Sequence, residues 1–340
     1  MRSRRLIQTV DSHTEGNPTR VVVGGVAVPP GRTLRERCDW LRIHDDQLRQ
    51  LLNFEPRGSS MMCSAVVMPP LNGGDFSVLL LEQDEYVPMC GHCMIGVATT
   101  VVETGMVPAT EGIVELTFET LAGAVKAMVH VDDGSVKRVT LANVGSFVWA
   151  DGVTLETRDH GRVLADIAFG GDFYAIVDAD SIGLELSPGS EVEAARAAAQ
   201  IIAAVDEQIH IEHPDDPAIT RCYETLFTTR RTTRGDYRHA VISPPGAYDR
   251  SPCWTGTSAR LALMYTKGQI GIGDTARFEG LLGTYFEAAI DSVERLGERT
   301  IVHPTITGRA FLTGFHSFLL DAADPFPRGY RIGPQAREQS

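Results

Sequence analysis

The sequence lacks the features that mark nucleic-acid-binding, membrane and disulfide-stabilised proteins. Its net charge of −13 is the opposite of the basic surface that a nucleic-acid partner requires. No apolar run is long enough to cross a bilayer, and the start, MRSRRLIQTVDSHT, has no apolar core of a signal peptide. Six cysteines in 340 residues are too few for a disulfide scaffold. We therefore expect a cytoplasmic protein with reduced thiols and with neither nucleic acid nor membrane as a partner.

Sequence motifs for common cofactors are also missing. There is no P-loop, and no G-x-G-x-x-G stands between a strand and a helix. Cys90 and Cys93 form a C-x-x-C, a spacing found in redox and zinc sites. No second C-x-x-C follows, so a zinc site is not expected. The sequence predicts no cofactor and no metal.

What the chain does contain is one stretch that occurs twice. Residues 90–105 read CGHCMIGVATTVVETG, and residues 253–268 read CWTGTSARLALMYTKG. Each begins with a cysteine shortly after a proline, becomes apolar at helical spacing, and reaches a glycine (Gly105 or Gly268) at the same distance. Glycine is favoured just beyond a helix C-terminus. The pattern predicts two buried helices, each with a thiol at its N-terminus.

Other landmarks repeat in the same order. Residues 171–177 resemble residues 16–22 at an offset of 155, and residues 278–283 resemble 118–123 at an offset of 160. The two cysteines are 163 residues apart. We interpret this as an internal duplication that gives two α/β halves. The predicted division is residues 1–120 with 315–340, and residues 121–314. The proline-broken tail, 321–333, is expected to return to the first half.

Periodicity predicts the main elements of both halves. In the first half we expect strands over 16–26, 61–68, 76–83 and 113–120, and a helix over about 32–53. In the second half we expect a helix over 187–209 and strands near 223–229 and 239–242.

A thiol at a helix N-terminus has a specific chemical use. The helix end favours the thiolate and is expected to lower the thiol pKa. Small residues after each cysteine (Gly91; Thr255, Gly256) leave the first helical amides free to bind a carboxylate. If the halves face each other, one thiolate could remove the α-proton of a carboxylate-bearing substrate while the opposite thiol returns a proton. Such an arrangement suits stereoinversion without a cofactor.

Position alone leaves two interpretations of the thiols open. A lone cysteine in a helix is usually a small buried hydrophobe, and Cys38, Cys63, Cys93 and Cys222 are interpreted in that way. Cys90 and Cys253 differ because they occupy equivalent positions at two helix starts. They are candidates both for catalysis and for ordinary packing.

The two cysteine motifs resemble those of a known family. MCGHCMIGVATTVVETG and DRSPCWTGTSARLA are similar to the catalytic motifs of the proline racemase family, usually written MCGH and DRSPCGTGTSA. DSHTEGNPTRVV (11–22), EPRGSSMM (55–62), FGGDFYAIVD (169–178) and GFHSFLLDAADPFPRGY (314–330) extend the resemblance over essentially the whole chain. The family also includes hydroxyproline 2-epimerases and trans-3-hydroxyproline dehydratases.

The resemblance implies a fold and a set of site residues. It implies the diaminopimelate-epimerase-like fold, an α/β (α+β) architecture of two pseudo-symmetric halves that each wrap a sheet around a central helix, and commonly a homodimer. It implies that Cys90 and Cys253 are the catalytic acid–base pair. Amides that would hold the substrate carboxylate are those of Gly91, His92, Trp254 and Thr255. Asp249, helped by the His92 side chain, would accept a hydrogen bond from the ring ammonium. From the residues alone, the favoured interpretation of Asp249 is an ordinary turn aspartate.

Two further positions bear on the substrate. Proline racemases tend to have phenylalanine where this chain has Cys63 and Ser243, and smaller residues leave room for a ring hydroxyl. Trp254 departs from the family's usual glycine, and the indole must either point away from the pocket or narrow it. Cysteine at position 253, where the dehydratases have threonine, favours inversion.

The predicted function is therefore 4-hydroxyproline 2-epimerisation, most directly of trans-4-hydroxy-L-proline to cis-4-hydroxy-D-proline. The alternatives are trans-3-hydroxy-L-proline dehydration, 3-hydroxyproline 2-epimerisation, proline racemisation, and non-catalytic binding of an amino acid.

Overall fold

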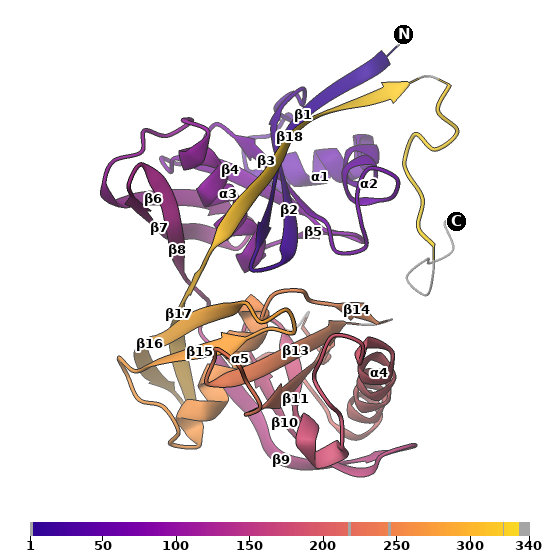
Figure 1. Cartoon of the computed structure of the whole chain (residues 1–340), viewed down its shortest axis with the longest axis vertical. Coiled ribbons are helices and arrows are strands. Elements are labelled where there is room, and N and C mark those ends of the chain that lie inside the picture. Colours follow the sequence, from indigo (N-terminus) through magenta and orange to yellow (C-terminus); the bar gives the residue numbers. More distant parts are fainter. Residues whose placement is uncertain (1–2, 217–218, 244–245, 322, 333–340) are drawn as a thin grey trace. The chain divides into compact units, whose positions relative to one another are not determined.

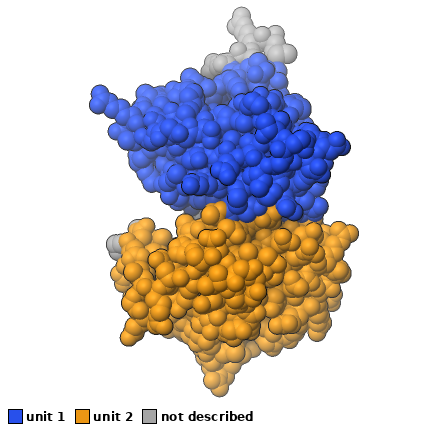
Figure 2. All heavy atoms as spheres, turned by 90° about the vertical axis from the view of Figure 1, so that its left-hand side faces the viewer, with its two compact units in different colours: residues 1–141, 308–340 blue, residues 142–307 orange. Residues whose placement is uncertain are grey.

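The computed structural model describes residues 3–216, 219–243, 246–321 and 323–332. The chain divides into two compact units, residues 1–141 with 308–340 (unit 1) and residues 142–307 (unit 2) (Figure 2). The division predicted from the sequence was placed at residues 120 and 315. Two strands that follow residue 120 continue an antiparallel meander of unit 1, so they belong with the first half.

The described residues of unit 1 form three helices and nine strands, of which eight come from the first part of the chain and one from near its end. Its helices are α1 (Leu34–His44), α2 (Gln47–Asn53) and α3 (Gly91–Glu103). Its strands are β1 (Ser3–Thr14), β2 (Asn17–Gly24), β3 (Cys63–Met68), β4 (Phe76–Leu81), β5 (Tyr86–Val87), β6 (Gly112–Thr120), β7 (Gly123–Asp132), β8 (Ser135–Ala142) and β18 (Ala310–Asp321).

Unit 2 repeats this composition from the middle of the chain. Its helices are α4 (Glu191–Gln208), α5 (Trp254–Thr266) and a short 3-10 helix (Ala179–Ile182). Its strands are β9 (Phe147–Thr157), β10 (Gly161–Phe169), β11 (Phe173–Asp178), β12 (Glu224–Thr229), β13 (Tyr237–Ser243), β14 (Ala247–Tyr248), β15 (Thr275–Glu279), β16 (Tyr285–Leu296) and β17 (Arg299–Gly308) (Figure 1).

Strand pairing demonstrates the duplication directly. In unit 1 the order β18-β1-β2-β3-β4-β6-β7-β8 has parallel pairs only at β2–β3 and β4–β6. In unit 2 the order β9-β10-β11-β12-β13-β15-β16-β17 has parallel pairs only at β11–β12 and β13–β15. The two sequences of parallel and antiparallel pairs are therefore the same, which confirms the predicted internal repeat.

Each unit is built around one buried helix, as predicted from the repeated stretch. All residues of α3 from Gly91 to Val102 are buried, and α5 is nearly as buried. Both helices are followed by a glycine with positive φ, Gly105 at 73° and Gly268 at 66°. Only glycine adopts this geometry without a steric penalty, so the two glycines end the helices as expected.

Alternation along the strands gives each sheet two apolar faces. In unit 1, Val66 and Met68 of β3 pack with α1 and α2, so Cys63 and Ala65 face the opposite side. In unit 2, Phe173 and Ala175 of β11 pack with α4, whereas Tyr174 and Ile176 pack with Cys253 and Ala259 of α5. Side chains at alternate positions of β3 and β11 are thus directed toward the thiol-bearing helices.

One predicted helix is interrupted. The helix expected over 32–53 is two helices, because Asp45 leaves helical geometry at φ −146° and ψ 38°. Its carboxylate accepts a hydrogen bond from Arg5 at 2.8 Å. Aspartate favours helix boundaries because its side chain competes for backbone hydrogen bonds, and the apolar pattern alone did not reveal the break at Asp45. The sequence patterns did not predict the strand β1 (Ser3–Thr14).

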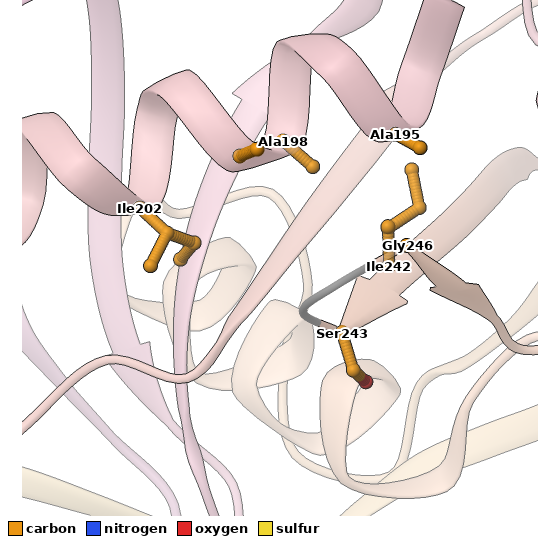
Figure 3. Close-up of a pocket in the computed structure, with 7 residues that line it drawn as sticks. Ala195, Ala198, Ile202, Ile242, Ser243 and Gly246 are labelled. Carbon is orange, nitrogen blue, oxygen red and sulfur yellow. The ribbon is translucent and has the colours of Figure 1, made fainter. Parts of the chain in front are cut away.

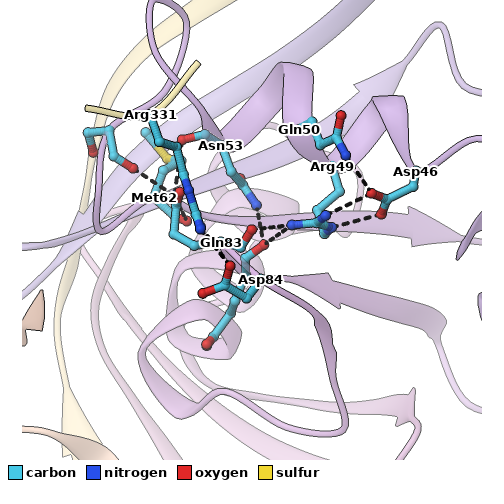
Figure 4. Close-up of polar contacts among 10 residues, drawn as sticks. Asp46, Arg49, Gln50, Asn53, Met62, Gln83, Asp84 and Arg331 are labelled. Atoms are coloured by element: carbon cyan, nitrogen blue, oxygen red, sulfur yellow. Dashed lines mark hydrogen bonds and ion pairs between the residues drawn. The ribbon is translucent and has the colours of Figure 1, made fainter. Parts of the chain in front are cut away.

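The C-terminal segment returns to unit 1, as predicted for the described part of 321–333. Arg57 pairs with Asp324, and Arg331 pairs with Asp84 at 2.6 Å. Nearby, the Gln83 amide donates to the carbonyl oxygens of Asn53, Ser59 and Met62 (Figure 4). The tail and two loops are therefore held by polar contacts rather than by an apolar core. Among the described residues, no helix is long and apolar enough to span a membrane.

Candidate active site

Cys90 stands at the first position of the buried helix of unit 1. It is the N-cap of α3, with extended geometry at φ −146° and ψ 107°, and it is 8% exposed. The amides of Gly91 and His92 follow it in the first turn, where no intrahelical carbonyl can accept from them. A thiol and two amides without an intrahelical acceptor thus lie side by side.

The surroundings of Cys90 do not lower its pKa, contrary to the expectation from the helix end. A hydrogen bond from Cys63 favours the thiolate, but burial and the charge of Glu82 outweigh it and raise the pKa of Cys90 to about 12. Desolvation disfavours any charged form. In this state Cys90 is a protonated thiol at neutral pH.

His92 is fixed beside Cys90 by the motif at residues 11–22. Its ring Nδ1 is 3.3 Å from the Cys90 sulfur. Thr14 donates to the His92 carbonyl at 2.7 Å, and the Asn17 amide is 3.2 Å from His92 Nε2. Burial lowers the pKa of His92 to about 4, so the ring is neutral. His13 of the same motif accepts from the Gly16 amide at 3.2 Å and braces the turn.

Cys63 lies against the first thiol. It opens β3 on the face directed toward α3, and it is 2% exposed. Hydrogen bonds with Cys90 and Cys93, together with burial, raise the pKa of Cys63 well above its usual value. The structure therefore brings together Cys63, Cys90 and His92, three of the predicted site residues.

Cys253 is the N-cap of the second buried helix and has an unusual backbone. Its φ is 65° and its ψ is 124°, a region that L-residues rarely adopt. Such strain is retained at sites where the surrounding structure enforces it. The sulfur accepts from the Gly256 amide at 3.3 Å and lies 3.6 Å from the Tyr174 hydroxyl. The same hydroxyl is 2.5 Å from Thr255 Oγ1.

Burial also governs the second thiol. Desolvation and the charges of Asp249 and Glu224 raise the pKa of Cys253 well above its usual value, while hydrogen bonds from Tyr174 and the Gly256 amide oppose this rise. Each thiol thus has a carboxylate in its electrostatic surroundings, Glu82 for Cys90 and Glu224 for Cys253.

Asp249 combines a turn contact with a contact to the thiol. Its Oδ1 accepts from the Ser251 amide at 2.8 Å and from the Ser251 hydroxyl at 2.9 Å. Burial raises the pKa of Asp249 to about 6, against the lowering effect of these Ser251 bonds and of a hydrogen bond with Cys253. The residue therefore ionises close to neutral pH.

Ser243 alternates along β13 to the same face as Val241, which packs with Cys253. Its hydroxyl donates to Glu224. The residue also lines a shallow apolar hollow against α4, formed with Ala195, Ala198 and Ile202. Figure 3 shows that the Ser243 hydroxyl is directed away from this hollow. Ser243 therefore adds no polar group to the lining of the hollow.

The Trp254 indole packs into unit 2. It is 3% exposed and meets the Phe286 ring of β16 edge-on, with 5.9 Å between ring centroids. Its Nε1 has no hydrogen-bond partner among the described residues. The bulky residue in place of glycine is thus accommodated by a core aromatic pair.

Two neighbours of Cys253 were missed by the sequence analysis. Tyr174 lies in FGGDFYAIVD, and Glu224 opens the adjacent strand; the two are paired across β11 and β12. The equivalent pair in unit 1 is Thr19 and Cys63. The repeat offset of 155 could have directed attention to Tyr174, but only the register of the parallel strands matches Glu224 with Cys63.

Comparisons with known proteins cover the whole of both units. The family model described as proline racemase matches residues 9–331. A protein of Streptosporangium roseum named 4-hydroxyproline 2-epimerase is 41% identical over 98% of this chain and 100% of its own length. A proline racemase of Clostridioides difficile is 36% identical, with 97% of this chain and 99% of that protein covered.

Solved structures give the same result. The crystal structure of a hydroxyproline epimerase from Agrobacterium vitis with bound trans-4-hydroxy-L-proline has a TM-score of 0.86 and 34% identity, over 98% of this chain and 96% of that one. A probable proline racemase from Agrobacterium radiobacter with bound carbonate has a TM-score of 0.84 and 32% identity, over 96% of each chain. The likeness confirms the predicted diaminopimelate-epimerase-like fold.

Proposed function

Because the chain belongs to the proline racemase family, we propose that it inverts the α-carbon of a hydroxyproline, converting trans-4-hydroxy-L-proline to cis-4-hydroxy-D-proline without a cofactor. The protein is an isomerase of the amino-acid racemase and epimerase type. One observation carries the proposed mechanism: an equivalent cysteine caps the buried central helix of each repeated unit.

In a two-thiol inversion, the two thiols act on opposite faces of the substrate α-carbon. One thiolate, at Cys90 or Cys253, removes the α-proton from one face, and the other thiol delivers a proton to the opposite face. Negative charge that develops on the carboxylate is stabilised by helix amides aimed at it. The amides of Gly91, His92, Trp254 and Thr255 are our candidates for this role.

The raised thiol pKa values support a role as general acid. A buried thiol that stays protonated at neutral pH is ready to donate, and the reverse reaction exchanges the roles of the two residues. The ring ammonium of the substrate would pair with Asp249, whose carboxyl already contacts Cys253. A cation at this position also favours the nearby thiolate.

Substrate choice depends on a ring hydroxyl. Cys63 and Ser243 are our candidates for the positions that accommodate it, because both face a thiol-bearing helix and both are small. The relative from S. roseum, at 41% identity, carries the name of a 4-hydroxyproline 2-epimerase. Proline racemisation is the second candidate, since the C. difficile relative is 36% identical over nearly the same length.

Hydrogen exchange at the α-carbon tests the proposal. In deuterated water, trans-4-hydroxy-L-proline should gain deuterium at the α-carbon, and its optical rotation should change as the epimer forms. L-proline and trans-3-hydroxy-L-proline are tested as alternative substrates in parallel reactions. Exchange with L-proline alone would favour racemisation, and a carbonyl product from the 3-hydroxy substrate would favour dehydration. Absence of exchange with all three would contradict the proposal.

Single substitutions test the two-thiol mechanism. Cys90→Ser and Cys253→Ser should each reduce inversion about 10²–10⁴-fold, the usual contribution of one acid–base group. Cys38→Ser is the matched control, because Cys38 is a buried thiol of α1. Full activity of either the Cys90 or the Cys253 variant would refute the mechanism.

A homodimer and a cytoplasmic location stay predictions from the sequence.

A further inference from the structure

Three ligands for a soft metal ion meet at the start of α3. The sulfurs of Cys63 and Cys90 and a ring nitrogen of His92 all lie within 4.8 Å of one another. Cys63 comes from β3, whereas Cys90 and His92 come from the helix, so two separate elements supply the set. The three residues are 2%, 8% and 9% exposed. Two sulfurs and one imidazole form a known ligand set for zinc.

The spacing of these atoms is close to that of a tetrahedral site. Zinc–sulfur and zinc–nitrogen bonds of about 2.3 and 2.0–2.1 Å place neighbouring ligand atoms roughly 3.5–3.8 Å apart. The Cys90 sulfur is 3.3 Å from His92 Nδ1 and 3.9 Å from Nε2. Only small side-chain adjustments would therefore bring the three atoms around one ion, with the fourth position left open.

The charges of the group also suit a divalent cation. Two thiolates would neutralise the ion, and the imidazole is already neutral because burial lowers the pKa of His92 to about 4. Each thiol would bind the ion as a thiolate, so metal binding would release the thiol protons.

Neighbouring residues hold the imidazole in place. One ring nitrogen donates to the Pro18 carbonyl, so the other carries the lone pair of the neutral ring. The Asn17 amide lies against the ring, and Thr14 fixes the His92 carbonyl. Such outer contacts orient metal-binding histidines in established sites.

The second unit does not repeat this ligand set. The position equivalent to Cys63 holds Glu224, and Cys253 is followed by Trp254 and Thr255 instead of a histidine. A soft metal ion should therefore distinguish between the two thiols, although their helices are equivalent.

We propose that Cys63, Cys90 and His92 form a binding site for one thiophilic divalent cation, Zn²⁺ or Cd²⁺, and that its occupation withdraws the Cys90 thiol from catalysis. The inhibitory consequence rests on the proposed function of Cys90, whereas binding of the ion does not. The site would make the enzyme reversibly sensitive to free zinc.

Binding can be measured without reference to activity. Titration of the full chain with Cd²⁺ should give a thiolate-to-cadmium charge-transfer band that saturates at one equivalent. Zn²⁺ affinity is measured by competition with a chromogenic chelator. Loss of an outer-shell contact alone weakens metal sites about 10–100-fold, so Cys63→Ser and His92→Ala should each weaken binding by at least about tenfold.

Two matched controls separate this ligand set from other thiols. Cys38→Ser removes a buried thiol of α1, and Cys222→Ser removes a buried thiol of unit 2; both should bind one ion as the wild type does. Circular dichroism of each variant establishes that it is folded. Absence of the band in the wild type, unchanged affinity in Cys63→Ser, or loss of binding in Cys222→Ser would overturn the proposal.

Activity then tests the second half of the proposal. Zn²⁺ should inhibit wild-type epimerisation, and a chelator should restore it. Inhibition of Cys63→Ser, measured against its own metal-free rate, should require at least about tenfold more zinc. Equal sensitivity of the two proteins would overturn the inhibitory role. A protein that binds cadmium as expected but shows no α-exchange with any substrate would contradict the proposed function and leave the metal site standing.

Discussion

Tyr174 connects Cys253 to its surroundings through a single hydroxyl. That hydroxyl contacts the sulfur of Cys253 and Thr255 Oγ1, and its hydrogen bond lowers the pKa of Cys253. Glu224 forms a hydrogen bond with the same tyrosine, and its negative charge raises the pKa of the Cys253 thiol. The pKa of Cys253 thus depends on residues from two adjacent strands.

Tyr174→Phe should slow inversion by raising the pKa of Cys253 further. Loss of one hydrogen bond of this kind corresponds to about 1.4 kcal/mol, or about tenfold in rate. The kcat profile should shift toward alkaline pH. Tyr237→Phe is the control, because its hydroxyl accepts from Arg230 at 3.2 Å. A kcat profile of Tyr174→Phe identical to that of the wild type would show that the hydroxyl does not act on the thiol.

Asp249 should make substrate binding dependent on pH. Burial raises its pKa to about 6, so the carboxylate needed to pair with a ring ammonium is present above that pH and is lost as the pH falls through it. KM for trans-4-hydroxy-L-proline should therefore rise between about pH 7 and 5.

Asp249→Asn should remove this inflection and raise KM about 10–100-fold, as expected for loss of a charged hydrogen bond. Asp236→Asn provides a control, since Asp236 is a turn carboxylate of the same unit that accepts from the Arg277 amide. Persistence of the inflection in the Asp249 variant would assign it to another group.

At the scale of secondary-structure elements, both units contain an equivalent carboxylate that holds a loop, in addition to the equivalent thiol-bearing helix. Glu119 of β6 accepts from the amides of Leu71, Asn72 and Gly74. Glu279 of β15, at the equivalent place in unit 2, accepts from the amides of residues 233–235. Each carboxylate closes the loop that leads into a central strand.

Glu119→Gln should destabilise unit 1 by about 1.5–3 kcal/mol, the range for hydrogen bonds to a charged group. Burial disfavours ionisation of Glu119, but hydrogen bonds from Ser77 and the three amides outweigh it and lower the pKa to about 2. The contribution to stability is complete above the unfolded pKa of about 4.3 and is lost as the pH falls toward 2.

Urea unfolding of the variant between about pH 7 and 3 measures this effect, because the difference from wild type should shrink with acidification. Glu115→Gln on the same strand is the control, since Glu115 is exposed. Equal stability of Glu119→Gln and the wild type at pH 7 would mean that water replaces these bonds without cost.

At the scale of the whole molecule, the two units are not equally continuous in sequence. Unit 2 is one segment, residues 142–307, with its own core, whereas unit 1 needs residues from both ends of the chain. The strand β18 pairs with β1 from Ser3 to Thr14. The N-terminal part of unit 1 therefore lacks an edge partner when it is alone.

A fragment of residues 142–307 should fold by itself and unfold cooperatively in urea, monitored by circular dichroism. A fragment of residues 1–141 should not, because the unpaired β1 edge and the missing β18 leave apolar surface exposed. Joining residues 308–332 to its end through a short flexible linker should restore folding. A cooperative transition of residues 1–141 alone would show that β18 is dispensable.

The sequence by itself determined the duplication, the two buried helices with their thiols, and the family. These features depend on local patterns, because helix periodicity, the terminal glycines and the spacing of Cys90 and Cys253 are recorded along the chain. The resemblance of their motifs also made Asp249 and His92 candidates for the site. The tertiary structure then showed that burial reverses the expected effect of a helix end on the thiol pKa.

Only the tertiary structure decided which residues surround each thiol. Cys63 was assigned from the sequence to the substrate pocket, but its contacts with Cys90 and Cys93 depend on the parallel pairing of β2 and β3. Glu224 and Tyr174 meet through the same kind of pairing in unit 2. Parallel strands are joined by long crossovers, so their register is not written in any local pattern. That register therefore determines which side chains contact the Cys90 thiol.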